Sequence, residues 1–156
     1  MRRAANTDPT TLLIALAAAY CIASLVHFVH NAEYLAQYPN MPPWLSRSKV
    51  YASWLGITAL GALGFAFVRG GYAVAGLVLI GVYAAFGFDG LGHYALAPIS
   101  SHTLAMNLSI WFEVAAAAAL LLVALHRLLH RLTSSQKAQH AFADKMVRSQ
   151  PMGDHR

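Results

Sequence analysis

The chain has 156 residues, of which 58% are hydrophobic and 11% are charged, with 11 Lys and Arg against 6 Asp and Glu. This length suits one domain, and this composition excludes an ordinary soluble protein, so the sequence predicts an integral membrane protein. The excess of basic residues does not indicate a nucleic-acid-binding surface, because most of them flank apolar segments. The lone Cys21 excludes an internal disulfide and a two-cysteine redox centre.

Four apolar segments are long enough to cross a bilayer, and we therefore expect an all-α, four-helix transmembrane bundle. We expect helices at residues 11–37, 48–68, 72–96 and 102–131, after an N-terminal segment at 1–10 and before a polar tail at 132–156. The weak apolar pattern of the tail favours disorder or a helix loosely bound to the membrane surface. We interpret the first segment as a retained span and not as a cleaved signal peptide.

The distribution of basic residues predicts the orientation of the bundle. The loop before the second span carries Arg47 and Lys49, whereas the two chain ends and the loop at Arg69 carry all other Lys and Arg residues. Basic loops stay on the cytoplasmic side of a membrane. We therefore expect both termini in the cytoplasm and a multi-pass protein of a bacterial inner membrane.

Half of the acidic residues lie inside or at the edge of apolar segments, where a charge is costly and usually functional. These are Glu33, Asp89 and Glu113. His30 precedes Glu33 by three residues and His93 follows Asp89 by four, and such spacings put two side chains on one face of a helix. The sequence therefore predicts two acid–histidine pairs and one isolated intramembrane glutamate.

Antiparallel spans bring these residues to the same leaflet. The first and third helices run in one direction with their polar residues near the end, while the fourth runs back with its polar residues near the start. We therefore expect eight polar side chains to meet near the non-cytoplasmic face: His27, His30, Glu33, Asp89, His93, His102, Asn107 and Glu113.

Imidazole and carboxylate groups are ordinary ligands of zinc, iron and manganese, and a carboxyl–histidine pair also suits general acid–base catalysis. The candidate catalytic residues are Glu33, Asp89, Glu113, His30, His93 and Asn107. The candidate metal ligands are His30, Glu33, Asp89, His93 and Glu113, with His27 and His102 as weaker candidates. Haem held by two histidines is less favoured, because the carboxylates lie close to them.

The leading hypothesis is a metal-supported or acid–base enzyme, of isomerase, cyclase or hydrolase type, that acts on a lipid-like or other apolar small molecule. Five aromatic residues are candidates for the walls of its pocket: Tyr51, Trp54, Tyr83, Phe86 and Trp111. Two alternatives stay open. One is a non-catalytic metal- or haem-binding subunit or a proton or ion path, and the other is a structural or assembly partner. The Gly/Ala-rich helix faces also suit a homo-oligomer in the membrane.

The segment from His30 to Tyr34, with Leu35 and the Tyr38–Pro39 pair after it, resembles the HXXEE family of small bacterial membrane proteins. That family is named for a histidine and two acids at the end of an early membrane helix. Here Tyr34 stands where the second glutamate would be. His93, Pro98 and Thr103 are similar to the second half of the family pattern. The resemblance implies a polar site at the end of the first span and names no reaction.

Overall fold

The computed structural model describes residues 9–148, so the outer parts of the predicted N-terminal segment and tail lie outside the described residues. The α-helices are α1 (Pro9–Glu33), α2 (Arg47–Arg69), α3 (Ala73–Ala85), the short α4 (Gly92–Leu96) and α5 (Leu104–Arg148). Three 3-10 turns join them: η1 (Leu35–Gln37), η2 (Phe86–Leu91) and η3 (Ile99–Ser101).

The described residues contain helices and no strand, and four helical segments are long and apolar enough to cross a membrane. These are Thr10–Glu33, Arg47–Arg69, Ala73–Leu96 and Leu104–Met146. The prediction of an all-α protein with four candidate spans is therefore confirmed.

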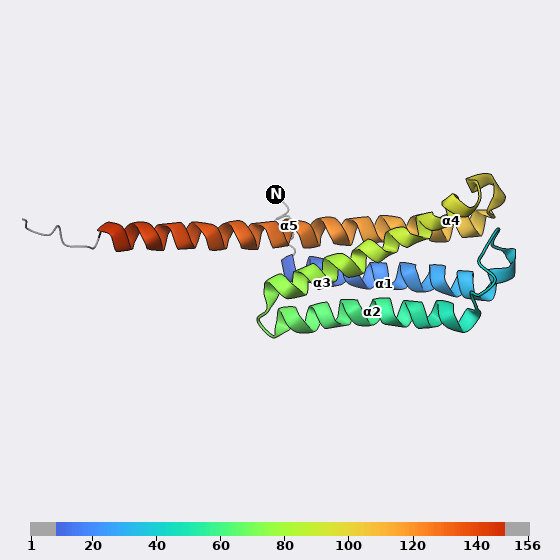
Figure 1. Cartoon of the computed structure of the whole chain (residues 1–156), viewed down its shortest axis with the longest axis horizontal. Coiled ribbons are helices and arrows are strands. Elements are labelled where there is room, and N and C mark those ends of the chain that lie inside the picture. The colour runs from blue at the N-terminus through green and yellow to red at the C-terminus, as the bar shows by residue number, and fades with distance from the viewer. Residues whose placement is uncertain (1–8, 149–156) are drawn as a thin grey trace, which may run out of the picture.

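The third span is not one regular helix. Its α-helical part ends at Ala85, and the chain tightens into η2 before it resumes as α4. A Cβ atom at Gly87 would lie 2.4 Å from the Cβ atom of Ala117 and 2.7 Å from the Tyr20 ring, so only glycine lets η2 lie this close to α1 and α5. The span starts beside α2 and crosses diagonally to lie along α5 (Figure 1).

Helix α5 differs from its predicted end at residue 131, because it continues to Arg148. Residues 132–148 contain no glycine or proline, so nothing in the chain interrupts the helix. Its 45 residues span about 68 Å at 1.5 Å per residue, roughly twice the hydrocarbon thickness of a bilayer. The second half of α5 extends beyond the other helices as a single rod (Figure 1).

The apolar core lies between α1, α3 and α5, in the half of the bundle where α1 begins. It includes Leu13, Tyr20, Leu77, Ile80 and Leu120. Helices α2 and α3 approach closely through glycines, because a Cβ atom at Gly76 would lie 2.6 Å from the Gly64 carbonyl oxygen. The opposite half of the bundle is where buried polar side chains gather.

Candidate functional site

A buried imidazole–carboxyl pair links α1 to α5. The Nε2 atom of His27 lies 3.7 Å from the Oε2 atom of Glu113, and the two side chains are 3% and 1% exposed. A buried charge is costly unless it is paired. The pair is neutral overall when it holds one exchangeable proton, either on the carboxyl group or on the imidazole.

Ser109 determines which nitrogen of His27 faces Glu113. The Ser109 hydroxyl donates its only hydrogen to the Met106 carbonyl oxygen at 2.9 Å. The 3.2 Å contact between Ser109 Oγ and His27 Nδ1 is therefore a bond that the Nδ1–H group donates. This tautomer leaves Nε2 without a hydrogen, 3.7 Å from the Oε2 atom of Glu113, which is buried and has no hydrogen-bond partner among the described residues.

A second buried pair joins α1 to α4. The Asn31 side-chain amide donates to Nε2 of His93 at 3.3 Å, which assigns the ring proton of neutral His93 to Nδ1. The ring of His93 contacts that of His27 edge to face, with 5.5 Å between centroids, and His102 lies 6.2 Å from His93. Three histidines and Glu113 thus form one continuous buried cluster.

Tyr38 closes this cluster at its outer end. Its side chain is 3% exposed, its ring lies 4.8 Å from that of His93, and its hydroxyl lies 2.9 Å from Nδ1 of His30. Burial raises the pKa of the Tyr38 hydroxyl to about 12. The phenol is therefore a protonated donor at neutral pH, and His30 joins the cluster through it.

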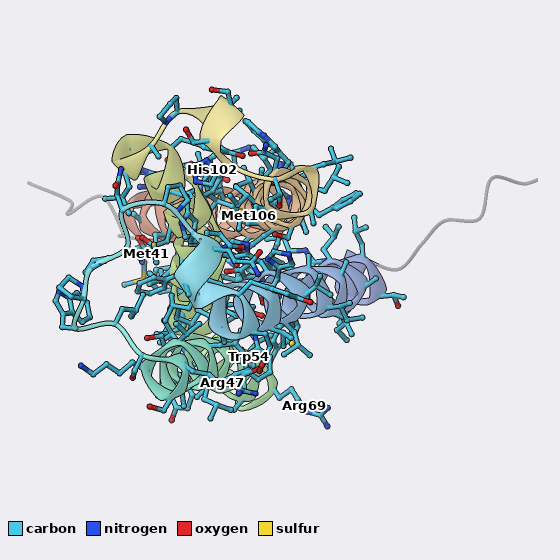
Figure 2. The ribbon with its side chains drawn as sticks, turned by 90° about the vertical axis from the view of Figure 1, so that its right-hand side faces the viewer. Met41, Arg47, Trp54, Arg69, His102 and Met106 are labelled. Carbon is cyan, nitrogen blue, oxygen red and sulfur yellow. The ribbon has the colours of Figure 1, made fainter. Side chains whose placement is uncertain are left out.

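A groove of about 1000 Å³ lies against the cluster, between α1, α2 and the η2–α4 segment. Its walls are mainly apolar, and residues 41–45 of the α1–α2 loop border its outer end. Figure 2 looks onto this end of the bundle and labels Met41, one of the loop residues that line the groove. His27, Asn31 and His93 bring the buried polar cluster to the wall of the groove.

Gly90 lies beside both the groove and Glu113 of the buried pair. It lines the groove, and a Cβ atom built on it would lie 3.4 Å from Glu113 Oε2 and 3.7 Å from His27 Nε2. No side chain at this position shields the pair. Only the backbone of Gly90 therefore lies between the groove and Glu113 Oε2 at this point.

The eight predicted site residues do not all meet. His27, His93, His102 and Glu113 are buried together, and His30 reaches them through Tyr38. The other three, Glu33, Asp89 and Asn107, lie apart from this cluster.

Glu33 faces away from the cluster. Its carboxylate accepts a 2.6 Å hydrogen bond from Tyr51 and pairs with Arg47, both at the start of α2. This geometry makes Glu33 a link between α1 and α2 at the rim of the bundle.

Asn107 stabilises the α4–α5 connection. Its side-chain oxygen accepts from the Tyr94 hydroxyl at 2.9 Å, and its amide donates to the carbonyl oxygens of Ile99 and His102. Asp89 is exposed and lines the groove without joining the buried cluster.

Among residues 9–148, no group of three or more His, Cys, Asp or Glu side chains is arranged to hold a metal ion. The predicted ligands are divided between the groove, the buried cluster and the rim at Glu33. His27 and His93 contact each other directly, which leaves no room for a haem between their rings.

The aromatic residues expected around the pocket have mixed positions. Phe86 lines the groove, and Tyr83 lines a smaller hollow of about 270 Å³ between α1, α2 and α3. Tyr51 is bonded to Glu33, and the Trp54 indole donates to Ser24 at 3.2 Å. Trp111 packs on Tyr94.

Sequence reasoning missed Asn31 and Ser109 as members of the cluster. Each lies four residues from a residue that it did select, because Asn31 follows His27 and Ser109 precedes Glu113. A spacing of four puts both on the same helix face, so this signal was present in the sequence.

No protein-family model, curated protein or solved structure matches this chain. The site therefore has to be interpreted from its own geometry.

Proposed function

We propose that this protein is a membrane-embedded enzyme that transfers a proton to or from an apolar, lipid-like small molecule. The observation that carries the proposal is the buried His27–Glu113 pair, which meets the groove at Gly90. An imidazole that lies next to a carboxyl group beside a substrate-sized groove is suited to general acid–base catalysis.

Each polar residue has a defined role in this proposal. Glu113, whose Oε2 atom is the nearest side-chain atom to a Cβ position at Gly90, exchanges the proton with the substrate, while Nε2 of His27 accepts that proton from Glu113 or returns it. Ser109 holds His27 in the tautomer whose Nε2 atom faces Glu113. Asn31 and His93 form the polar part of the groove wall, where a hydroxyl or carbonyl group of the substrate would be oriented.

The groove walls support an apolar substrate. Phe28, Ile57, Phe86 and Leu96 are among the residues that line it. Its volume of about 1000 Å³ is at the upper end of the range of about 300–1000 Å³ that small-molecule sites occupy. Its position between spans favours entry of a molecule that is already dissolved in the membrane.

The other readings have less support. The metal-supported form of the hypothesis lacks a ligand set in residues 9–148. A proton or ion path would have to continue past Glu113 into the other half of the bundle, where the apolar core around Ile80 and Leu120 lies. A purely structural role for the cluster does not explain why a groove of this size lies against it.

Deuterium exchange tests the proposal. The protein in lipid nanodiscs is incubated in D₂O with a total apolar extract of membranes, and mass spectrometry follows deuterium at carbon-bound positions. We expect wild type to label one class of compound, and Glu113→Gln and His27→Gln to lower the rate by about 10²–10⁴-fold. Gly81→Ala is the matched control, because a Cβ atom there contacts only Leu121 at 3.8 Å. Equal labelling by wild type and Glu113→Gln would contradict the proposal.

The same proposal includes the orientation and surroundings of the protein. We place both termini in the cytoplasm of a bacterial cell and the site in the outer leaflet of the inner membrane, on the distribution of Arg and Lys. Membrane lipids are the immediate partners. A homo-oligomer stays a prediction, and Gly61 and Gly64 are already packed against α3 within the chain. Membership of the HXXEE family also stays a proposal, which rests on the residues from His30 to Pro39.

A further inference from the structure

Asp89 is an unpaired carboxylate inside a candidate membrane span. It belongs to the span Ala73–Leu96, its side chain is exposed, and it lines the groove. Among the described residues it has neither a hydrogen bond nor an ion pair. An ionisable side chain at such a position is functional by default, and its partner has to be identified.

The basic groups that share the groove with Asp89 are already engaged. Lys49, on the α2 wall, donates to the Trp44 carbonyl oxygen at 2.8 Å and lies 5.3 Å above the Trp44 ring. His27 is bonded to Ser109 and faces Glu113, and His93 accepts from Asn31. None of these groups forms a hydrogen bond or an ion pair with Asp89, so its carboxyl group stands between the apolar walls of the groove without a bonded partner among residues 9–148.

We infer that the groove binds an amphiphile that carries an amine, with its ammonium group against Asp89 and its apolar body along Phe28, Ile57 and Phe86. An ammonium donor and a carboxylate acceptor form a charge-assisted hydrogen bond, which is stronger than a bond between neutral groups. This inference rests on the proposed function, because it names the substrate class of the same groove.

A series of twelve-carbon probes that differ only in their head group tests the inference. Radiolabelled dodecylamine, dodecanol and dodecanoate are bound to the full chain in nonionic detergent at pH 7 and measured by equilibrium dialysis. We expect wild type to bind the amine roughly tenfold to hundredfold more tightly than the alcohol, with the carboxylate weakest. Equal affinity for the amine and the alcohol would overturn the inference without need of any variant.

Two substitutions test whether the probes bind in the groove with their head group at Asp89. Asp89→Asn is expected to lower amine affinity to that of the alcohol, and an undiminished amine preference would overturn the inference. Gly56→Leu is expected to weaken all three probes, because Gly56 lines the groove and a Cβ atom there meets nothing within 4 Å. Ala59→Leu, at an exposed position of α2 that does not line the groove, is the matched control and should bind as wild type does.

The amine has two possible sources: a single-chain amine, or the ethanolamine head group of a phospholipid. Mass spectrometry of lipids that copurify with wild type and Asp89→Asn separates them. Ethanolamine lipid retained by wild type, lost from Asp89→Asn and displaced by dodecylamine identifies the head group, and its absence identifies a single-chain amine. Deuterium exchange without amine preference would overturn this inference alone, whereas amine preference without exchange would overturn the proton-transfer proposal alone.

Discussion

The Nε2 atom of His27 lies 3.7 Å from the Oε2 atom of Glu113, and both side chains are sealed inside the bundle. One comes from the first span and the other from the last, so the partners are 86 positions apart in the sequence. The pair joins two helices, and in the proposed function it also exchanges a proton with the substrate. Its two roles can be separated by substitution.

Glu113→Gln and Glu113→Ala distinguish chemistry from packing. Glutamine keeps the shape of the side chain and carries no charge, so we expect the melting temperature to change little while proton transfer is lost. Alanine leaves a cavity beside an orphaned His27, and we expect the free energy of unfolding to fall by about 2–4 kcal/mol. Unfolding of the detergent-solubilised variants measures the melting temperature and the free energy of unfolding, and deuterium exchange measures proton transfer. A large destabilisation by glutamine would instead favour the structural reading of the pair.

Gly90→Ala tests whether the groove communicates with the pair. The new methyl group would lie in van der Waals contact with His27 Nε2 and Glu113 Oε2, and it clashes with neither. We therefore expect an unchanged melting temperature and a deuterium-exchange rate at least tenfold lower, since the methyl group comes between substrate and pair. Wild-type exchange in a folded Gly90→Ala protein would show that the proton reaches the substrate elsewhere.

Gly87→Ala tests the close contact of η2 with α1 and α5. The added Cβ atom would lie 2.4 Å from that of Ala117, and neither backbone can retreat without disturbing the core. We expect a loss of about 1–3 kcal/mol in the free energy of unfolding. Gly81→Ala, where the nearest heavy atom is 3.8 Å away, serves as the comparison and should be at least as stable as wild type. If the two variants have the same melting temperature, η2 and α5 are far enough apart to accept a methyl group at residue 87.

Tyr38→Phe tests the pH dependence of stability. The pKa of Tyr38 is about 12 in the folded protein against 10.0 for an ordinary tyrosine, because its hydroxyl is buried. Unfolding therefore releases this proton above pH 10, so the stability contribution is complete below pH 10 and is lost as pH rises to 12. The loss amounts to roughly 2–3 kcal/mol.

The measurement is the difference in the free energy of unfolding between pH 9 and pH 11.5. We expect this difference to be smaller for Tyr38→Phe than for wild type, because phenylalanine has no proton to lose. Identical differences for the two proteins would mean that Tyr38 is accessible to water in the folded state.

Apolar segment length was sufficient to predict the four spans, because a bilayer imposes a minimum number of apolar residues on each crossing. The predicted helix ends were less accurate in the third span and in α5. The break at η2 depends on how closely Gly87 approaches Ala117, and the sequence alone contains no measure of that approach.

The candidate site was likewise predictable only in part from the sequence. Residue types and antiparallel topology brought His27, His93, His102 and Glu113 to one end of the bundle, as the sequence predicted. Glu33 was placed with them, yet six residues along a helix rotate a side chain by about 120° from His27. Only the packing of α1 against α5 decides which of the two faces inward.

By itself, the sequence determined the all-helical class of the protein, its four candidate spans and the end of the bundle at which most of its buried polar residues gather. Those properties depend on composition and on the order of segments along the chain. The tertiary structure alone decided that His27 meets Glu113, that Glu33 does not, and that a groove with an unpaired Asp89 lies beside them. The reason is that side-chain packing between distant segments sets which face of each helix points inward. The same packing sets the distance between α2 and α4.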